Sequence, residues 1–522
     1  MSFTSINFLI FLGVLIVLYY VLPKKIQWVI LLIASYVFYA LCGVEYLAFI
    51  VFTTLSTYGV TLYMDNNHRI QKAYLAENKN ILSKEEKKAY KKSVKKKDRW
   101  LFILVLAVNF GILFFCKAAL VDPLRSLSDS SVISFLSLGL PFGMSFYMFQ
   151  SMGYVIDVYR SKAEVERNFF KLALFISFFP QLVQGPISKW EQIKDSLFCE
   201  HRFDRRQIAF GLERMLWGFF KKLVVADRIA VAIAALKGSE YTGVSFFILT
   251  VFYAVQIYGD FTGGIDIAIG VGEVLGVKMP ENFIRPFFSK NIAEYWRRWH
   301  ISLNEWMKSY IFYPITVSGP MLKLSVNGRK KLGNFGKRLP VYIGSILTWL
   351  GTGVWHGFNL HFIVWGLLNC AIIVLSEELA PLYEKFHSRA AWSNGRGYNI
   401  FQMIRMFVLM NLIRATDLFN DVGDYFRRVG SLAWKFNFNV LWDGSLMDLG
   451  LSAADYIILG CSVILMFIVS FVSRDDVPFR VKFLKLPRVL RYVLIIALVL
   501  VVLLFGSYGI GYDASKFIYN QF

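Results

Sequence analysis

The chain has 522 residues, of which 56% are hydrophobic, and a mean hydropathy of +0.49. These values exclude an ordinary soluble protein and indicate a membrane protein that crosses the bilayer several times. The net charge of +21 is concentrated in loops, which favours anionic lipid headgroups over nucleic acid as the partner. The five cysteines show no metal-ligand spacing, so we expect no metal site.

Apolar segments recur along the whole chain. A helix needs about 20 apolar residues to cross about 30 Å of hydrocarbon, and the lengths and gaps here allow roughly a dozen such segments. We expect them at about 3–22, 26–41, 44–63, 100–118, 133–158, 207–235, 243–258, 399–419, 454–472 and 489–508. The first of these is too long and too uniformly apolar for a signal peptide, so it is expected to be a retained helix.

Two basic segments predict the orientation of the chain. Residues 65–99 carry 12 Lys and Arg against five Asp and Glu, and residues 473–491 carry six against two. Positive charge marks cytoplasmic loops, so both termini are expected outside the cytoplasm. The lysine run within 65–99 is expected to be a solvated amphipathic or disordered face, or else a docking site for an acidic carrier. Without internal repeats, 1–522 is expected to form a single membrane domain, with 65–99 as a cytoplasmic loop and 509–522 as an outer tail.

Two stretches interrupt the simple pattern of spans. Residues 175–190 are apolar but broken by two prolines and a glycine, which favours a half-crossing. Residues 258–276 are rich in glycine and hold Asp260 and Asp266 in apolar surroundings. A bare carboxylate there costs several kcal/mol, so these side chains are expected either to be paired near a cavity or to cap helices at the membrane interface.

Residues 281–319 are aromatic, basic and bounded by prolines, which is typical of a segment at the membrane interface. Two tryptophans, two arginines and a histidine lie together in it: Trp296, Arg297, Arg298, Trp299 and His300. The two arginines can hold phosphates, because guanidinium groups match phosphate oxygens. Anchoring to lipid headgroups is the alternative.

Residues 339–376 contain no Lys, Arg, Asp or Glu and have His356 near their midpoint. The run is too long for one span, and a cluster of glycines divides it into arms at about 339–354 and 360–376. We expect a bend below the membrane surface, where an ionisable group is a functional candidate; an interfacial turn is the alternative. His361 would not share a helical face with His356, and their spacing is not that of a zinc site.

At these residues the chain resembles the membrane-bound O-acyltransferase family, in its bacterial alginate O-acetyltransferase branch. The matching stretches are FFPQLVQGPI (178–187), DFTGGIDIAIG (260–270), EYWRRWHISLNEWMKSYIFYPI (294–315) and GTGVWHGFNLHFIVWG (351–366). The chain departs from the branch at Gly264-Ile265, where a Tyr-Ser pair is usual, and at Asn369-Cys370, where His-Gly is usual.

The resemblance implies an all-α polytopic fold, in which a ring of transmembrane helices with re-entrant segments surrounds a central tunnel. It implies that His356 is the catalytic histidine and that His300 is the second functional position. Burial disfavours an imidazolium, so His356 would act as a neutral base. His300 would orient the donor or stabilise its carbonyl oxygen, and both roles stay open. The expected substrate-binding residues are Arg297, Arg298, Trp296, Trp299, Trp355, Asp260 and Asn359.

The implied reaction moves an acyl group, acetyl above others, from a cytoplasmic thioester across the bacterial cytoplasmic membrane to a polysaccharide of the cell envelope. Acetyl-CoA or an acyl-carrier-protein thioester would be the donor, and a secreted SGNH-type acyltransferase would be the partner. A D-alanyl transferase for teichoic acid is an alternative within the family. A transporter or polymer-export subunit, with Asp260 and Asp266 as coupling carboxylates, is an alternative from another class.

The tail, 511–522, holds Tyr519 between Phe517 and Phe522. It resembles the aromatic carboxy-terminal motif of the branch, F-x-Y-F-x-F, although Asn520 replaces a phenylalanine. We expect Tyr519 to attack the thioester with His356 as its base and to carry the acyl group, since a phenol of pKa about 10 leaves more readily than a sugar alcohol. A frayed tail with an interfacial tyrosine is the alternative.

Overall fold

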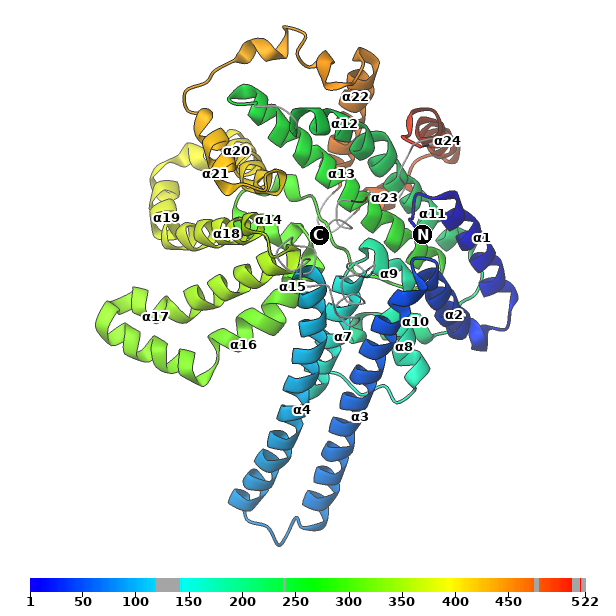
Figure 1. Ribbon diagram of the computed structural model, residues 1–522, viewed down its shortest axis with the longest axis vertical. Helices are drawn as coiled ribbons and strands as arrows, with labels where there is room; N and C mark the ends of the chain where they lie inside the picture. Colours follow the sequence, from blue (N-terminus) through cyan, green and yellow to red (C-terminus); the bar gives the residue numbers. More distant parts are fainter. Residues whose placement is uncertain (119–140, 142, 238–240, 474–477, 509–516, 518–522) are drawn as a thin grey trace, which may run out of the picture. The chain divides into compact units, whose positions relative to one another are not determined.

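The computed structural model describes residues 1–118, 141, 143–237, 241–473, 478–508 and 517. The regular elements of the described residues are helices (Figure 1). These residues also contain one isolated β-bridge, between Phe283 and Trp299. They divide into two compact units, which are taken separately below. Unit 1 comprises Met1–Leu212 and Ala268–Pro280, and unit 2 comprises Glu213–Ile267 and Glu281–Phe522.

Within the described ranges, six helices are long and apolar enough to cross a membrane. They are α3 (Leu47–Glu77), α4 (Lys84–Ala118), α13 (Val244–Val274), α18 (Leu360–Glu378), α22 (Ala453–Val472) and α24 (Arg488–Phe505). The expected multi-pass, all-α architecture is therefore confirmed. Helix α1 (Ile6–Val21) is apolar but, at 16 residues, shorter than a full crossing requires.

Unit 1 has a core of short buried helices. Besides α1, α3 and α4 it contains α2 (Gln27–Ala40), α7 (Met144–Tyr159), α8 (Phe169–Ser177), α9 (Phe179–Gln184), α10 (Trp190–Phe198) and the start of α11 (Arg205–Phe219). The break expected in 175–190 is confirmed, because α8 ends at Ser177 and α9 ends before Gly185-Pro186. All six residues of α9 are buried. Its irregular backbone thus lies inside protein, as such backbone must at membrane depth.

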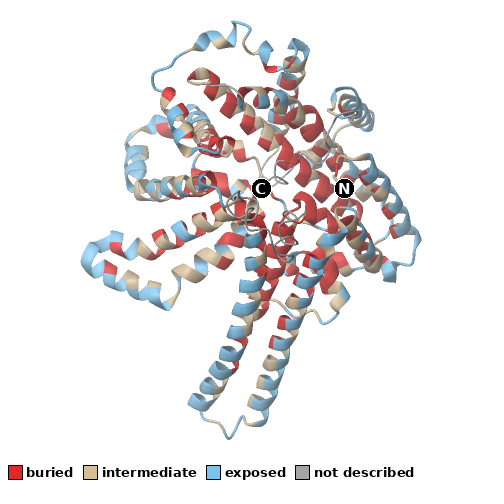
Figure 2. Ribbon diagram, in the orientation of Figure 1, coloured by how far each residue is buried: buried red, intermediate tan, exposed pale blue. Residues whose placement is uncertain are grey.

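The basic segment 65–99 is helical, which corrects its description as a loop. Helices α3 and α4 continue through most of it and lie side by side as a hairpin (Figure 1). Helix α4 begins at a capping box, in which Ser83 and Glu86 exchange hydrogen bonds of 2.8 and 3.2 Å. Lysine and glutamate form helices readily, so the charges do not interrupt the turns. Most of these lysines are exposed while Val94 and Asp98 are buried, which matches the expected solvated amphipathic face. Figure 2 shows the far end of the hairpin mostly in the colour of exposed residues.

Unit 2 holds the two regions that the sequence singles out for chemistry. Its further helices are α12 (Asp227–Lys237), α14 (Ile292–Arg298), α15 (Ile301–Met307), α16 (Tyr313–Thr316), α17 (Gly319–His356), α19 (Ala380–Arg389), α20 (Arg396–Arg414), α21 (Val422–Ser431) and α23 (Phe479–Phe483). Two π-helical turns, Phe220–Ala226 and Lys308–Phe312, interrupt the α-helical pattern.

Helix α13 runs past the predicted end at 258, straight through the glycine-rich stretch. The reason is close helix packing. A Cβ on Gly263 would lie 2.9 Å from the carbonyl oxygen of Gly218, and a Cβ on Gly259 would lie 2.9 Å from that of Lys221. These glycines therefore permit contact with the helix that contains Gly218, as small residues do between membrane helices.

The expected bend at His356 is confirmed. Helix α17 ends at His356 and α18 begins at Leu360, so the two arms form a hairpin. A Cβ on Gly353 would lie 2.6 Å from the carbonyl oxygen of Phe362, which shows how closely the arms approach. Helix α17 also contains a second bend at Gly333, whose φ of 60° suits glycine.

Candidate active site

His300 lies between α14 and α15 and is held by pairing with an extended segment. The amide of Ile301 donates to the carbonyl of Asn282 (3.0 Å), and the amide of Ile284 donates to that of Arg298 (3.0 Å). The φ of His300 is 47°, an uncommon value for a residue other than glycine and one that is often found at functional sites. Its side chain is only 2% exposed.

The tautomer of His300 follows from its neighbours. Asn282 Oδ1 accepts hydrogen bonds from the amide and the hydroxyl of Ser302, both at 3.0 Å, which identifies that atom as the amide oxygen. His300 Nδ1 lies 3.4 Å from the same oxygen and is therefore the ring nitrogen that carries the proton. Nε2 of the neutral ring is then an acceptor.

Burial keeps the His300 ring neutral. Burial, together with the nearby positive charge of Arg414, lowers the pKa of His300 to about 3. The imidazole thus stays uncharged at any pH near neutrality, with one proton on Nδ1.

His356 is the last residue of α17 and is 5% exposed. Its ring centroid lies 4.8 Å from that of Trp355, 4.9 Å from that of Trp365 and 5.9 Å from that of Phe362. The Trp355 ring also lies 5.9 Å from that of His300. The structure therefore brings both histidines next to one indole, that of Trp355, although 55 residues separate them in the chain.

Tryptophans surround this histidine pair. Trp296 donates to Asn369 Oδ1 (3.1 Å), and Trp299 is 1% exposed. The Arg414 guanidinium lies over the rings of Trp299 and Trp365, at 5.6 and 5.4 Å. We name Trp296, Trp299, Trp355, Trp365, His300 and His356 the aromatic site.

Three residues in or beside the aromatic site are not predicted from the sequence as functional residues. Arg414 lies within the expected span 399–419 and forms a buried ion pair with Asp417 (3.1 Å). Trp365 was not singled out. Asn369 was seen only as a departure from the branch, and its link to Trp296 is visible in the structure alone.

The remaining predicted binding residues differ in their surroundings. Arg298 forms an ion pair with Glu294 (2.8 Å) and is largely enclosed, whereas Arg297 is exposed. Asn359 is exposed in the bend before α18, and its backbone carbonyl accepts from Phe362 (3.1 Å). Tyr519 lies outside the described residues.

Asp260 and Asp266 are both paired, so the pairing interpretation is confirmed and the helix-cap alternative is wrong. Both lie well inside α13 and not at its ends. Lys222 donates to Asp260 (2.6 Å) and to Asp227 (2.8 Å). Lys221 donates to Asp266 (2.5 Å), which also accepts from Arg214 (2.8 Å).

The π-helical turn Phe220–Ala226 explains how two consecutive lysines both meet α13. A π-turn inserts an extra residue, which rotates the neighbouring side chains toward one face. Lys221 and Lys222 are 3% and 1% exposed. The ring of Phe517 is buried and covers the Lys222 ammonium at 4.4 Å.

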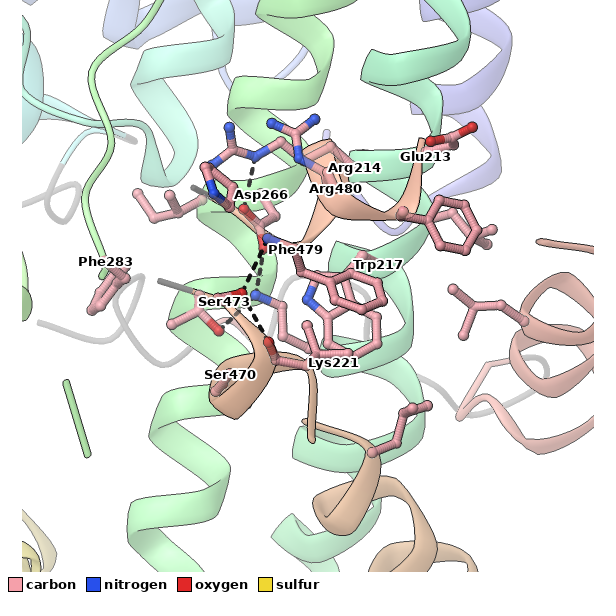
Figure 3. Close-up of a pocket in the computed structure, with 18 of the residues that line it drawn as sticks. Glu213, Arg214, Trp217, Lys221, Asp266, Phe283, Ser470, Ser473, Phe479 and Arg480 are labelled. Atoms are coloured by element: carbon pink, nitrogen blue, oxygen red, sulfur yellow. Dashed lines mark hydrogen bonds and ion pairs between the residues drawn. The ribbon is translucent and has the colours of Figure 1, made fainter. Parts of the chain in front are cut away.

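Asp266 also lines a cavity of about 450 Å³, which agrees with the expectation of a carboxylate paired near a cavity (Figure 3). Phe283 forms part of its lining and lies 5.0 Å from the ring of Trp299. The cavity is thus a neighbour of the aromatic site. Among the described residues no cluster of three His, Cys, Asp or Glu side chains has the arrangement of a metal site.

Comparison with known proteins identifies the chain. Residues 160–327 match the model of the MBOAT, membrane-bound O-acyltransferase family. The chain is 34% identical to a protein named Probable alginate O-acetylase AlgI from Azotobacter vinelandii, over 73% of this chain and 69% of that one. It is 32% identical to the Peptidoglycan O-acetyltransferase of Helicobacter pylori, over 72% and 69% of the two chains. It is 26% identical to the Teichoic acid D-alanyltransferase of Bacillus subtilis, over 50% and 62%. The chain, an all-helical multi-pass membrane protein, belongs to the membrane-bound O-acyltransferase family.

Proposed function

We propose that this O-acyltransferase transfers acetyl groups from a cytoplasmic thioester, across the bacterial cytoplasmic membrane, to a polysaccharide of the cell envelope. The observation that carries the proposal is the pair of buried histidines on one tryptophan, in a chain whose relatives at 32–34% identity are named as O-acetylating enzymes. Similarity to the D-alanyltransferase is lower and covers half of this chain, which favours acetyl over D-alanyl transfer.

His356 is the proposed base. It removes the proton of the attacking hydroxyl, whose oxygen then adds to the thioester carbonyl. Collapse of the intermediate breaks the C–S bond, and the thiolate leaves with the proton that His356 releases. The surrounding indoles exclude water, which would otherwise hydrolyse the thioester.

His300 is proposed to orient the donor. A neutral ring with its proton on Nδ1 presents an acceptor at Nε2, which can hold a donor N–H or O–H group. The alternative role, stabilising the carbonyl oxygen, needs a hydrogen at Nε2, so the Asn282 contact counts against it.

A pair of histidine variants tests the base. His356→Ala is expected to lower acetyl transfer by at least about 10²-fold, because a positioned base contributes about 10²–10⁴-fold. His361→Ala is the matched control, since His361 is also buried (5% exposed) and lies five residues away. We expect His361→Ala to stay within tenfold of the wild type. Activity of His356→Ala within the same tenfold range would exclude a base role.

Donor entry is proposed from the cytoplasm beside 290–310, with acetyl-CoA or an acyl-carrier-protein thioester as donor. Arg297 is the better phosphate ligand of the two arginines, because Arg298 is engaged with Glu294. Arg297→Gln is therefore expected to raise the KM for the donor more than Arg298→Gln does, at unchanged protein yield. Equal donor dependence of both variants and the wild type would assign the arginines to lipid anchoring.

Tyr519 is proposed to relay the acyl group to a secreted SGNH-type partner, with both termini outside the cytoplasm. Phe517, two residues earlier, is buried against the Lys222 ammonium of unit 2, which supports the proposal. Tyr519→Phe keeps the ring and removes only the nucleophile. Wild-type polymer acetylation by this variant would refute the relay without affecting the role of His356.

A further inference from the structure

The cavity of about 450 Å³ in unit 2 has a charged wall and an apolar wall (Figure 3). It lies among α11, α13, α22, α23 and α24, and its volume is in the range of small-molecule sites. Phe283 belongs to its lining, while His300 and His356 do not. The cavity is therefore distinct from the two histidines at which we propose that the acyl group is transferred.

The charged wall is built from buried groups. Arg214 and Lys221 are 5% and 3% exposed and are fixed by Asp266 and by Glu281, which Arg214 contacts at 2.5 Å. Because each of these buried cations has a carboxylate partner, the wall contains no isolated buried charge among these residues. Arg480, on the short helix α23, adds a further guanidinium to the lining.

The segment that carries Arg480, residues 473–491, is basic, with six Lys and Arg against two Asp. Ser470 and Ser473 also line the cavity, as Figure 3 shows. The Ser473 hydroxyl is engaged within the protein, because it donates to the carbonyl of Val469 (2.8 Å) and accepts from the amide of Phe479 (3.1 Å). The guanidinium group of Arg480 matches the geometry of phosphate oxygens. Clusters of basic residues just beyond a membrane helix also attract anionic lipid headgroups.

The apolar wall comes from α22 and α24, through Leu465, Val469, Leu494, Leu498 and Val501. Both helices are weakly covered by protein. Only 17% of the most apolar window of α22 and 6% of that of α24 are buried (Figure 2). Helices so exposed and so apolar face lipid, so a hydrocarbon chain can pass from the bilayer between them.

We propose that this cavity binds an anionic phospholipid. Its phosphate is held by Arg480, and one acyl chain lies between α22 and α24. The lipid completes the packing of α24, in which Val502 alone is buried. A nucleotide-bearing donor fits less well, because the part of the lining that comes from α22 and α24 is mostly aliphatic.

Native mass spectrometry of the delipidated full-length protein, titrated with phosphatidylglycerol or phosphatidylcholine, tests the proposal. Phosphatidylglycerol is expected to bind at least about tenfold more tightly, because the choline cation of phosphatidylcholine offsets the charge of its phosphate beside the cationic wall. Arg480→Gln should lower its affinity about tenfold, and Leu498→Trp, which fills the apolar end, should weaken both lipids. Lys485→Gln and Ile496→Trp are the matched controls, because neither residue lines the cavity, and they should leave binding unchanged.

Three outcomes overturn the proposal. Equal binding of the two lipids, unaffected by either cavity variant, would show nonspecific association. Displacement of phosphatidylglycerol by inorganic phosphate alone would show an anion site without a lipid chain. Displacement by acetyl-CoA, with a raised donor KM in Leu498→Trp, would assign the cavity to the donor.

Discussion

Removal of the Asp266 carboxylate should destabilise unit 2 strongly. Asp266→Asn keeps the size of the side chain but removes the charge that Lys221 and Arg214 contact at 2.5 and 2.8 Å. Arg214 retains Glu281, whereas Lys221 retains the hydroxyl of Thr262 (2.8 Å). The variant thus leaves a buried ammonium without its carboxylate.

Breaking a buried pair from one side costs about 3–5 kcal/mol. Asp266 is partly exposed (17% of its side chain), so we expect the lower end, about 3 kcal/mol. Lys221→Met leaves Asp266 with Arg214 and should cost about 1–2 kcal/mol. The double variant removes both charges, so its cost should fall about 1–3 kcal/mol below the sum of the single variants.

The assay is reversible unfolding of the purified protein in mixed micelles of mild detergent and dodecyl sulfate. It compares the wild type, the two single variants and the double variant. The exposed Glu384→Gln serves as the control for loss of one carboxylate and should stay within about 0.5 kcal/mol of the wild type. Additive single and double variants would refute the reasoning, as would an Asp266→Asn protein as stable as the control. A structural role of this kind is also distinct from that of a coupling carboxylate, which a transporter would need.

Two further predictions concern the aromatic site. The folded-state pKa of His300, about 3, is below its ordinary 6.5. The unfolded chain therefore binds a proton that the folded chain does not, and stability present above pH 6.5 should be lost as the pH falls toward 3, by about 1.4 kcal/mol per unit. In His300→Gln, the free energy of unfolding should fall by about 1.4 kcal/mol less per pH unit between pH 6.5 and 5 than in the wild type. An unchanged dependence of this free energy on pH would contradict a neutral His300 ring. Asn369→Leu should cost about 1–3 kcal/mol by leaving the buried Trp296 N–H without its acceptor, whereas Asn369→Gln should recover part of the loss. Thermal unfolding distinguishes the two variants, and equal stability of both would argue against the hydrogen bond.

The sequence by itself determined the membrane class, the break in 175–190 and the bend after His356. Each depends on a local cause: apolar run length, prolines within a helix, or glycines that end one. Local causes also set the limits of these predictions. The glycines of 258–276 looked like interruptions, yet they lie inside α13, because a glycine that weakens an isolated helix also permits close contact with another.

Only the tertiary structure decided which charges and rings meet. Asp260 and Asp266 had two open interpretations in the sequence, and the choice depended on Lys221 and Lys222, about 40 residues earlier, which a π-helical turn directs at α13. The meeting of His300 and His356 on the Trp355 ring likewise joins segments far apart in the chain. Such contacts follow from how helices pack, and packing depends on all the surfaces that meet at once, so no short stretch of sequence encodes them.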